Sequence, residues 1–134
     1  MEFINPESLG VPRGYSNGVV APAGARLLFI AGQIGWNEQQ RIVSADFAQQ
    51  FERALANVIA VVREAAGTPE NLARLVIYVT DKREYLAAQP EVGRRWRALM
   101  GHHFPAMALV EVKSLLEDDA KVEIEGMAVL LSNQ

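Results

Sequence analysis

Two carboxylates lie two positions apart near the C-terminal end of the chain, Glu123 and Glu125 in the run KVEIEGMAV. On a β-strand this spacing places both side chains on one face, together with the apolar Met127 and Val129. A carboxylate in a partly dry cleft can hold a water molecule or take up a substrate proton, which is general acid–base chemistry. Alternatively, both carboxylates lie at a wet strand end or pair with basic residues across an interface. Both interpretations stay open for Glu123, whereas the structural one is favoured for Glu125.

Two glycine-containing segments could border such a site. Tyr15 lies in the run RGYSNG, residues 13–18, whose glycines permit a sharp turn or a close approach of the backbone to a ligand. The segment either lines a binding site or forms a surface turn that Tyr15 anchors. Gly32 lies inside an apolar run and marks either a β-bulge or a close backbone approach.

Composition narrows the chemistry that is available. The 134 residues include no cysteine, which excludes disulfides and thiolates and leaves carboxylates, hydroxyls, histidines and backbone groups. A net charge of −3 argues against a broad nucleic-acid-binding surface, because phosphate contacts need many clustered basic residues. The sequence contains no phosphate loop, dinucleotide fingerprint or nucleophile elbow. Nucleic acid is therefore not the expected partner.

The histidines and clustered arginines have ordinary structural interpretations. His102 and His103 are adjacent, without the spacing of four that helical metal ligands need, and a cation at a helix C-terminus is stabilised by the helix dipole. We therefore expect no metal site. Arg94, Arg95 and Arg97 are interpreted as a solvated helix face, although such a cluster could attract phosphate.

The hydrophobic pattern predicts a single α+β domain over residues 1–134, with the element order ββαβαββ. One helix begins after the capping residue Asp46 and ends near Gly67. A second helical region begins after Asp81, breaks near Gln89 and restarts with Pro90, because proline cannot donate a backbone hydrogen bond. The predicted strands are Tyr15–Ala21, Leu27–Ile34, Leu72–Thr80, Ala106–Val112 and Ala120–Leu131.

Two helices can cover only one face of such a sheet, yet the last strand is apolar on both faces. Met127, Val129 and Leu131 alternate with a second apolar set, which comprises Val122, Ile124, Ala128 and Leu130. Leaving either face in water would expose a large apolar patch, so the pattern predicts self-association.

The first residues carry no recognisable targeting signal. Residues 1–10 lack the basic start and apolar run of a secretory signal, and no run of about 18 apolar residues is present to span a bilayer. The expected location is cytoplasmic, without membrane contact.

Four segments resemble the Rid family, also called YjgF/YER057c/UK114, in order and approximate spacing. Gly14–Val19, GYSNGV, resembles the family's PYSQAV-like segment, and Leu27–Gly35, LLFIAGQIG, resembles its SGQ strand. Phe104–Met107 reads FPAM where the family usually has FPAR, and Val110–Val129 is similar to the family's signature end. The resemblance covers nearly the whole chain.

The resemblance implies a chorismate-mutase-like α+β fold with two helices on one face of a mixed sheet. It also implies a homotrimer whose sheets form a central barrel, with a small-molecule cleft between subunits. Active relatives hydrolyse reactive enamines and imines, such as 2-aminoacrylate, to 2-keto acids and ammonia without a cofactor. Some relatives carry an endoribonuclease L-PSP label, which finds little support in a chain with a net charge of −3.

The family's site residues map onto this sequence with one important departure. Glu123 corresponds to the glutamate that positions the attacking water, Tyr15 lines the pocket, and the backbone of Gly32 contacts the ligand. Met107 replaces the arginine that grips the substrate carboxylate, and methionine cannot donate hydrogen bonds to an anion. Arg13 is a candidate substitute cation. Ala31 replaces a serine that is common in the family.

Two functions follow from this pattern. The first is an enamine or imine deaminase in which Met107 selects a bulkier or less anionic substrate than the usual one. The alternative is a ligand-binding or sensing trimer that keeps the cleft without catalysis. Tight ligand binding without turnover would distinguish the second function from the first.

Overall fold

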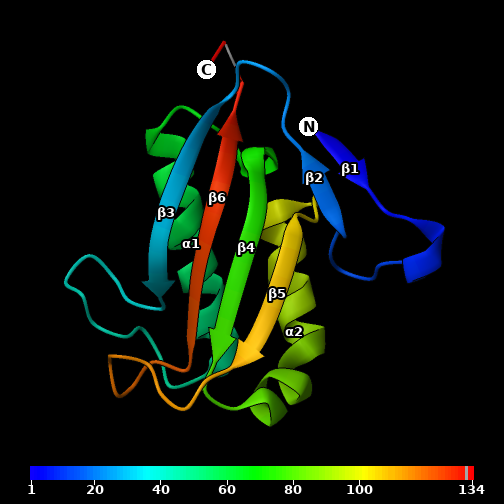
Figure 1. Ribbon diagram of the computed structural model, residues 1–134. Helices are drawn as coiled ribbons and strands as arrows, with labels where there is room; N and C mark the ends of the chain where they lie inside the picture. Colours follow the sequence, from blue (N-terminus) through cyan, green and yellow to red (C-terminus); the bar gives the residue numbers. More distant parts are fainter. Residues whose placement is uncertain (132) are drawn as a thin grey trace.

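A mixed sheet with two helices on one face forms the body of the chain (Figure 1). The computed structural model describes residues 1–131 and 133–134, and in these the strand order is β3-β6-β4-β5. The strands are β3 (Arg26–Ile34), β4 (Leu72–Val79), β5 (Ala106–Glu111) and β6 (Val122–Leu130). β6 pairs antiparallel with both β3 and β4, whereas β5 runs parallel to β4. The α+β prediction is therefore confirmed.

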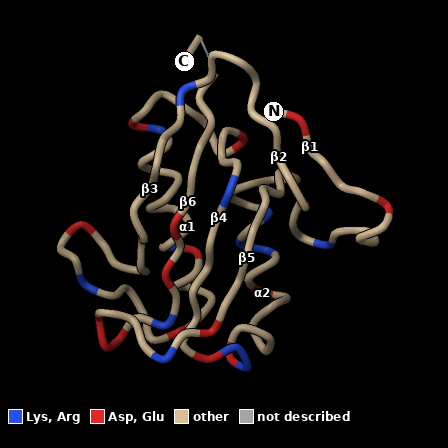
Figure 2. The backbone as a smooth tube through the Cα atoms, in the orientation of Figure 1, with Lys and Arg blue, Asp and Glu red and all other residues tan. Residues whose placement is uncertain are grey.

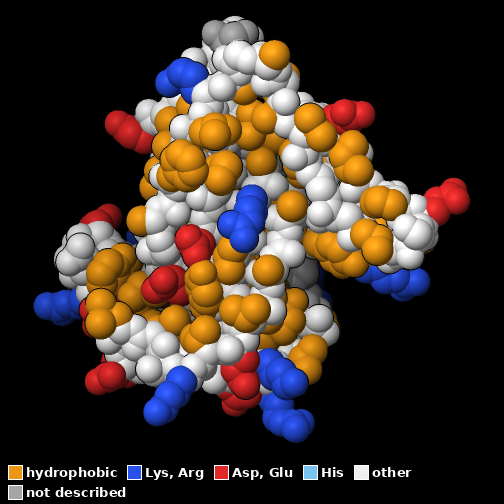
Figure 3. All heavy atoms as spheres, viewed as in Figure 1, with side chains coloured by type: hydrophobic (Ala, Val, Ile, Leu, Met, Phe, Trp, Pro, Cys, Tyr) orange, Lys and Arg blue, Asp and Glu red, His pale blue; other side chains and the backbone are white. Residues whose placement is uncertain are grey.

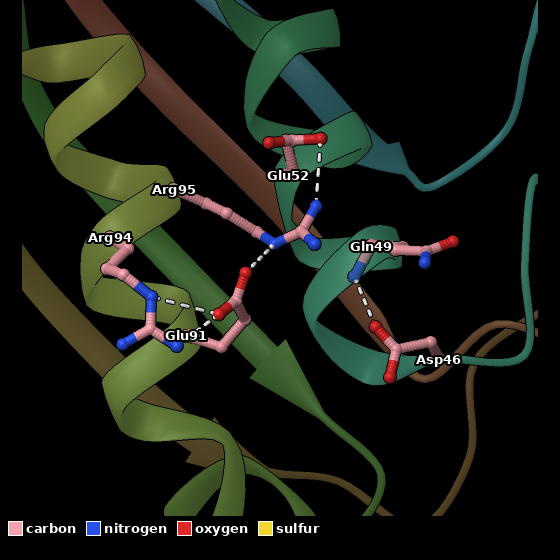
Figure 4. Close-up of polar contacts among 6 residues, drawn as sticks. All are labelled: Asp46, Gln49, Glu52, Glu91, Arg94 and Arg95. Atoms are coloured by element: carbon pink, nitrogen blue, oxygen red, sulfur yellow. Dashed lines mark hydrogen bonds and ion pairs between the residues drawn. The ribbon is translucent and has the colours of Figure 1, made fainter.

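Helix α1 (Phe47–Glu64) begins and ends where the sequence predicts. The Asp46 side chain caps it by accepting a hydrogen bond of 3.0 Å from the backbone N–H of Gln49 (Figure 4). At the other end the helix stops just before the predicted Gly67, and the left-handed residue there is Ala66, at φ 66°. Gly67 is needed for packing instead, because a Cβ there would lie 2.8 Å from Leu130 Cδ2.

Helix α2 (Lys82–Met100) is continuous, so the predicted break near Gln89 is wrong. Pro90 lies inside the helix and deprives the Leu86 carbonyl of its helical donor. Leu86 and Gln89 are exposed, so water can solvate that carbonyl at small cost. None of the helices described has the length and apolarity needed to cross a bilayer.

Polar contacts join α2 to α1 across the helix pair (Figure 4). Arg95 reaches Glu52 of α1 at 3.0 Å and Glu91 of its own helix at 2.9 Å, so it is not simply solvated as predicted. Arg94 also bonds Glu91. Hydrogen bonds from Arg94 and then Arg95 lower the pKa of the Glu91 carboxyl. The Arg95–Glu52 contact links α2 to α1.

The N-terminal segment forms a separate small sheet in which β1 (Glu2–Ile4) pairs with β2 (Gly18–Val20). The predicted strand Tyr15–Ala21 is therefore shorter than expected and does not extend the main sheet, and β1 was not predicted. Ser16 fixes the segment to the start of β5, because its N–H donates to the Pro105 carbonyl at 3.0 Å. Short 3-10 helices span Glu7–Leu9 and Pro69–Asn71.

The two faces of the main sheet differ in character. The helix side holds the core, whose largest fully buried side chains include Phe51, Leu55, Leu72, Leu75 and Ile124. On the other face Phe29 is 71% exposed and Leu27 is 52% exposed. Figure 3 shows hydrophobic side chains over much of this open face, with charges of both signs near its centre, and Figure 2 shows few charged positions along the strands. The prediction that the helices cover one face only is confirmed.

Candidate functional site

Glu123 and Gly32 lie together on the open face of the sheet. Glu123 of β6 pairs with Ile34 of β3, and the β3–β6 register shifts between Ile30 and Gln33, which places Gly32 in a bulge. A Cβ built on Gly32 would lie 2.4 Å from the Glu123 carboxylate oxygen Oε2. Both interpretations of Gly32 therefore hold, because it marks a bulge and also a close approach. The bulge gives the carboxylate its space.

Replacing Gly32 by Ala is expected to displace the Glu123 carboxylate without unfolding the chain. The new methyl group would clash with the mobile end of the glutamate side chain and not with backbone. Because a misplacement of about 1 Å can cost up to a hundredfold in rate, imine hydrolysis should fall about tenfold to a hundredfold. Steady-state kinetics and thermal unfolding of the variant check this. Wild-type kcat/KM in a folded variant would contradict it.

A second polar cluster occupies the same face next to Glu123. The Tyr78 hydroxyl donates a short hydrogen bond to the Glu125 carboxylate. Glu125 thus has a partner within its own chain, in line with its structural interpretation, but that partner is a tyrosine and not a basic residue. This hydrogen bond, followed by burial and the nearby negative charges of Glu125 and Glu123, raises the pKa of Tyr78.

The raised pKa of Tyr78 predicts an unusual alkaline titration. Absorbance at about 295 nm should show one of the three tyrosines ionising above the ordinary value of about 10. Because the folded-state pKa is raised, the stabilising contribution is complete below the unfolded pKa and is lost as pH rises through the folded pKa. Glu125→Gln should move this titration down, and Tyr78→Phe should remove it. Identical tyrosine titrations in wild type and Glu125→Gln would contradict the assignment.

Met107 and Arg13 line one cavity of about 370 Å³ on the helix side of the sheet. Met107 of β5 pairs with the buried Leu75 of β4, so its side chain points toward α2 and packs against the core. Arg13 comes from the N-terminal segment that Ser16 fixes to β5. Arg13, the candidate substitute cation, therefore lines the same cavity as Met107.

Tyr15 follows this cavity's Gly14 but is not among the cavity's lining residues, and its side chain is 39% exposed. The neighbouring Ser16 hydroxyl donates to the Phe104 carbonyl at 2.6 Å, which holds the segment on the FPAM sequence. Tyr15 therefore lies at the border of the cavity-forming segments and is partly exposed in the single chain.

Sequence reasoning missed the wall that α2 contributes to this cavity. Its residues share one helix face, with spacings of three and four, and comprise Tyr85, Gln89, Val92, Gly93, Trp96 and Arg97. Trp96 stacks on Phe104 at a centroid distance of 6.1 Å, and its indole N–H has no acceptor among the residues described. The helical spacing of these residues could have indicated a shared face. The expected break near Gln89 instead assigned them to two separate helices.

Other polar features of the chain are already occupied. His103 is buried, and its Nε2 lies 2.6 Å from the Leu72 carbonyl, with Phe3 packed edge-on against the ring. A larger open cavity of about 670 Å³ lies among the loops beyond the strand ends. Its Lys121 pairs with Glu84 at 2.8 Å, so that cation is compensated.

The two groups of site residues lie on opposite faces of the sheet. Glu123 alternates with the buried Val122 and Ile124, so it points away from the helices, whereas Met107 points toward them. A single chain therefore does not bring Glu123 and Met107 to the same cleft.

Comparison with known proteins identifies the family. The sequence family described as Endoribonuclease L-PSP matches residues 7–130. The RutC family protein PM1466 of Pasteurella multocida is 33% identical over 103 residues, 77% of this chain and 79% of the relative. The solved Rid-family protein YyfB from Yersinia pestis is 31% identical, with a TM-score of 0.84 over 96% of this chain and 98% of its own. Escherichia coli TdcF, whose name proposes a reactive intermediate deaminase and which was solved with bound serine, is 27% identical, with a TM-score of 0.68 over 91% of this chain and 92% of its own. This chain therefore belongs to the Rid family, as its motifs predict.

Proposed function

We propose that this chain hydrolyses an enamine or imine to a carbonyl compound and ammonia, with a substrate preference that differs from the family's usual one. The observation that carries the proposal is the Glu123 carboxylate set against the bulge at Gly32 on the open face of the sheet. TdcF supports the general class, since its name proposes a deaminase and its structure holds an amino acid.

The proposed site needs more than one copy of the chain. Glu123 and Gly32 lie on the open face, whereas Met107 and Arg13 line the cavity on the helix side. If they act on one substrate, they come from different subunits. The exposed Phe29 and Leu27 give the open face the apolar surface that an interface requires. We therefore propose a homotrimer with its clefts between subunits, as the family resemblance implies.

The chemistry assigned to Glu123 is general base catalysis. An enamine is first protonated at its β-carbon and loses a proton from its nitrogen, which gives the imine. Water then adds to the imine carbon, the C=N π electrons move to nitrogen, and Glu123 accepts a proton from the water and returns it to that nitrogen. The new hydroxyl next gives its proton to nitrogen, the C–N bond breaks, and the C=O bond forms as ammonia leaves.

Met107 determines which substrates are disfavoured. An arginine at this position could donate two hydrogen bonds to a carboxylate, whereas the methionine side chain offers the cavity only apolar surface. Small 2-imino acids, which have little apolar surface to bury, should therefore bind weakly. Substrates with a larger apolar body gain from the same methionine.

The Met107→Arg variant tests this assignment against 2-aminoacrylate generated in the assay. The new guanidinium can donate two hydrogen bonds to the substrate carboxylate, so the variant should gain about tenfold or more in kcat/KM for this substrate. Ammonia release measures the gain. Met107→Leu, which keeps an apolar side chain of similar volume, is the matched control and should behave like wild type.

Two outcomes would count against the proposal. If neither wild type nor Met107→Arg accelerates hydrolysis of any imine in a broad panel, the proposed enzymatic function is wrong. Tight binding without turnover in both would favour the ligand-sensing alternative.

A further inference from the structure

The cavity that contains Met107 carries two cations, Arg13 and Arg97, for which the described residues show no ion pair with a carboxylate. Arg13 and Arg97 both line it, and none of its lining residues in the described chain is Asp or Glu. The ion pairs found in residues 1–131 and 133–134 involve other basic residues, namely Arg94, Arg95 and Lys121. Two exposed arginines that line one cavity without an acidic neighbour among its lining residues attract an anion.

The rest of the cavity wall is apolar and aromatic. Trp96 and Phe104 lie parallel, with an interplanar angle of 1°, and Trp96 is only 8% exposed. Met107 and the buried Val92 complete this surface. The cavity volume of about 370 Å³ is at the lower end of the usual range for small-molecule pockets. It is larger than a very short substrate side chain fills.

The two features together define an amphiphilic ligand. We propose that this cavity selects 2-imino acids with a large aromatic or branched apolar side chain. The side chain packs on Trp96, Phe104 and Met107, and the carboxylate lies between Arg13 and Arg97 at the mouth. This inference rests on the proposed function and deepens it by naming the substrate class.

The arrangement also places the reacting atoms. In a 2-imino acid the imine carbon is bonded to the carboxylate carbon, so a carboxylate held at the mouth keeps the imine there as well. The apolar side chain then occupies the closed end of the cavity. The imine is left accessible to the Glu123 of a neighbouring copy, which the proposed trimer supplies.

Binding of unreactive analogues tests the ligand class directly. The chain has two tryptophans, so Trp36→Phe leaves Trp96 as the single indole, and its fluorescence reports occupancy of the cavity. We expect 3-phenylpropanoate to change this fluorescence with a Kd at least about tenfold lower than those of propanoate and of the neutral 3-phenylpropanamide. Equal affinity for the carboxylate and the amide would overturn the inference.

Charge-removing variants identify the two cations. In the Trp36→Phe background, Arg13→Gln and Arg97→Gln should each weaken 3-phenylpropanoate binding about tenfold, and the loss should shrink at high salt. Arg94→Gln is the matched control, because it removes the same charge from α2 but lies outside the cavity and pairs with Glu91. A double Arg13→Gln, Arg97→Gln variant that binds as tightly as its parent would overturn the assignment.

Turnover separates this inference from the proposed function. An amino acid oxidase can generate 2-imino-3-phenylpropanoate or 2-iminopropanoate, and ammonia release is measured above the uncatalysed rate. Selective binding of 3-phenylpropanoate without any turnover would support the ligand class and remove the hydrolase. Hydrolysis of 2-iminopropanoate alone, with no binding of 3-phenylpropanoate, would keep the hydrolase and overturn the ligand class.

Discussion

Replacing Glu123 by Gln should lower kcat for imine hydrolysis by about a hundredfold or more, in the range that loss of a general base usually costs. The amide has the same shape as the carboxylate and fits the same space beside Gly32. It can still hold a water molecule by a hydrogen bond, but it cannot accept the proton that the water must lose. The loss should therefore appear in kcat, with ligand affinity little changed.

Glu125→Gln is the matched control for this experiment. Glu125 lies on the same strand and face, two residues further on, and its carboxylate is engaged by Tyr78. It should lose no more than a few-fold in kcat, because the substitution removes the same charge away from the Gly32 bulge. Equal kcat values for wild type and Glu123→Gln would remove the mechanism. Equal losses in both variants would show that charge on this face matters and not the position of Glu123.

Replacing Gln50 by Leu should have the largest effect on stability. Gln50 of α1 is fully buried, at 0% exposure. Its amide group donates to the Ser44 carbonyl at 2.8 Å and to the Asp119 carbonyl at 3.0 Å, and accepts from the Lys121 N–H at 2.8 Å. Leucine would fill the space but leave three backbone groups without partners, which should cost about 3–5 kcal/mol in the free energy of unfolding.

Urea unfolding at fixed protein concentration measures this loss, since assembly would make apparent stability depend on concentration. Gln49→Leu is the matched control, because the neighbouring side chain is exposed and should change stability by less than about 0.5 kcal/mol. A loss below about 1 kcal/mol in Gln50→Leu would mean that water replaces the missing hydrogen bonds.

The elements that depend on local pattern were predictable from the sequence. Helix α1 combines the cap at Asp46 with apolar residues at helical spacing, and β4 is a β-branched run of strand length, so neighbours in sequence specify both. The break at Pro90 was wrong because α2 packs against the core on both sides of the proline, through Tyr85 before it and through Val92 and Trp96 after it. Local propensity does not contain that contribution.

The candidate site was predictable only in part. Residue type and family motif indicate Glu123 and Gly32, but their contact depends on a register shift between β3 and β6 that no local pattern encodes. Arg97 was assigned to a solvated face, but it lines a cavity together with Arg13 of the N-terminal segment. Contacts between residues far apart in sequence determine both the Glu123–Gly32 approach and the position of Arg97 in the cavity wall.

The strand order has a consequence for how the chain folds during synthesis. Of the four strands in the main sheet, β6 is the last to leave the ribosome, yet it lies between β3 and β4 and joins them. Until Val122–Leu130 emerges, β3 exposes both edges while α1 and the β4–α2–β5 unit are already available. Folding of the sheet therefore waits for β6 and is slow for the chain's length, because the β3–β6 and β4–β6 pairings close the longest loops. Before β6 emerges, the unpaired edges of β3 must be kept from pairing with strands of other chains.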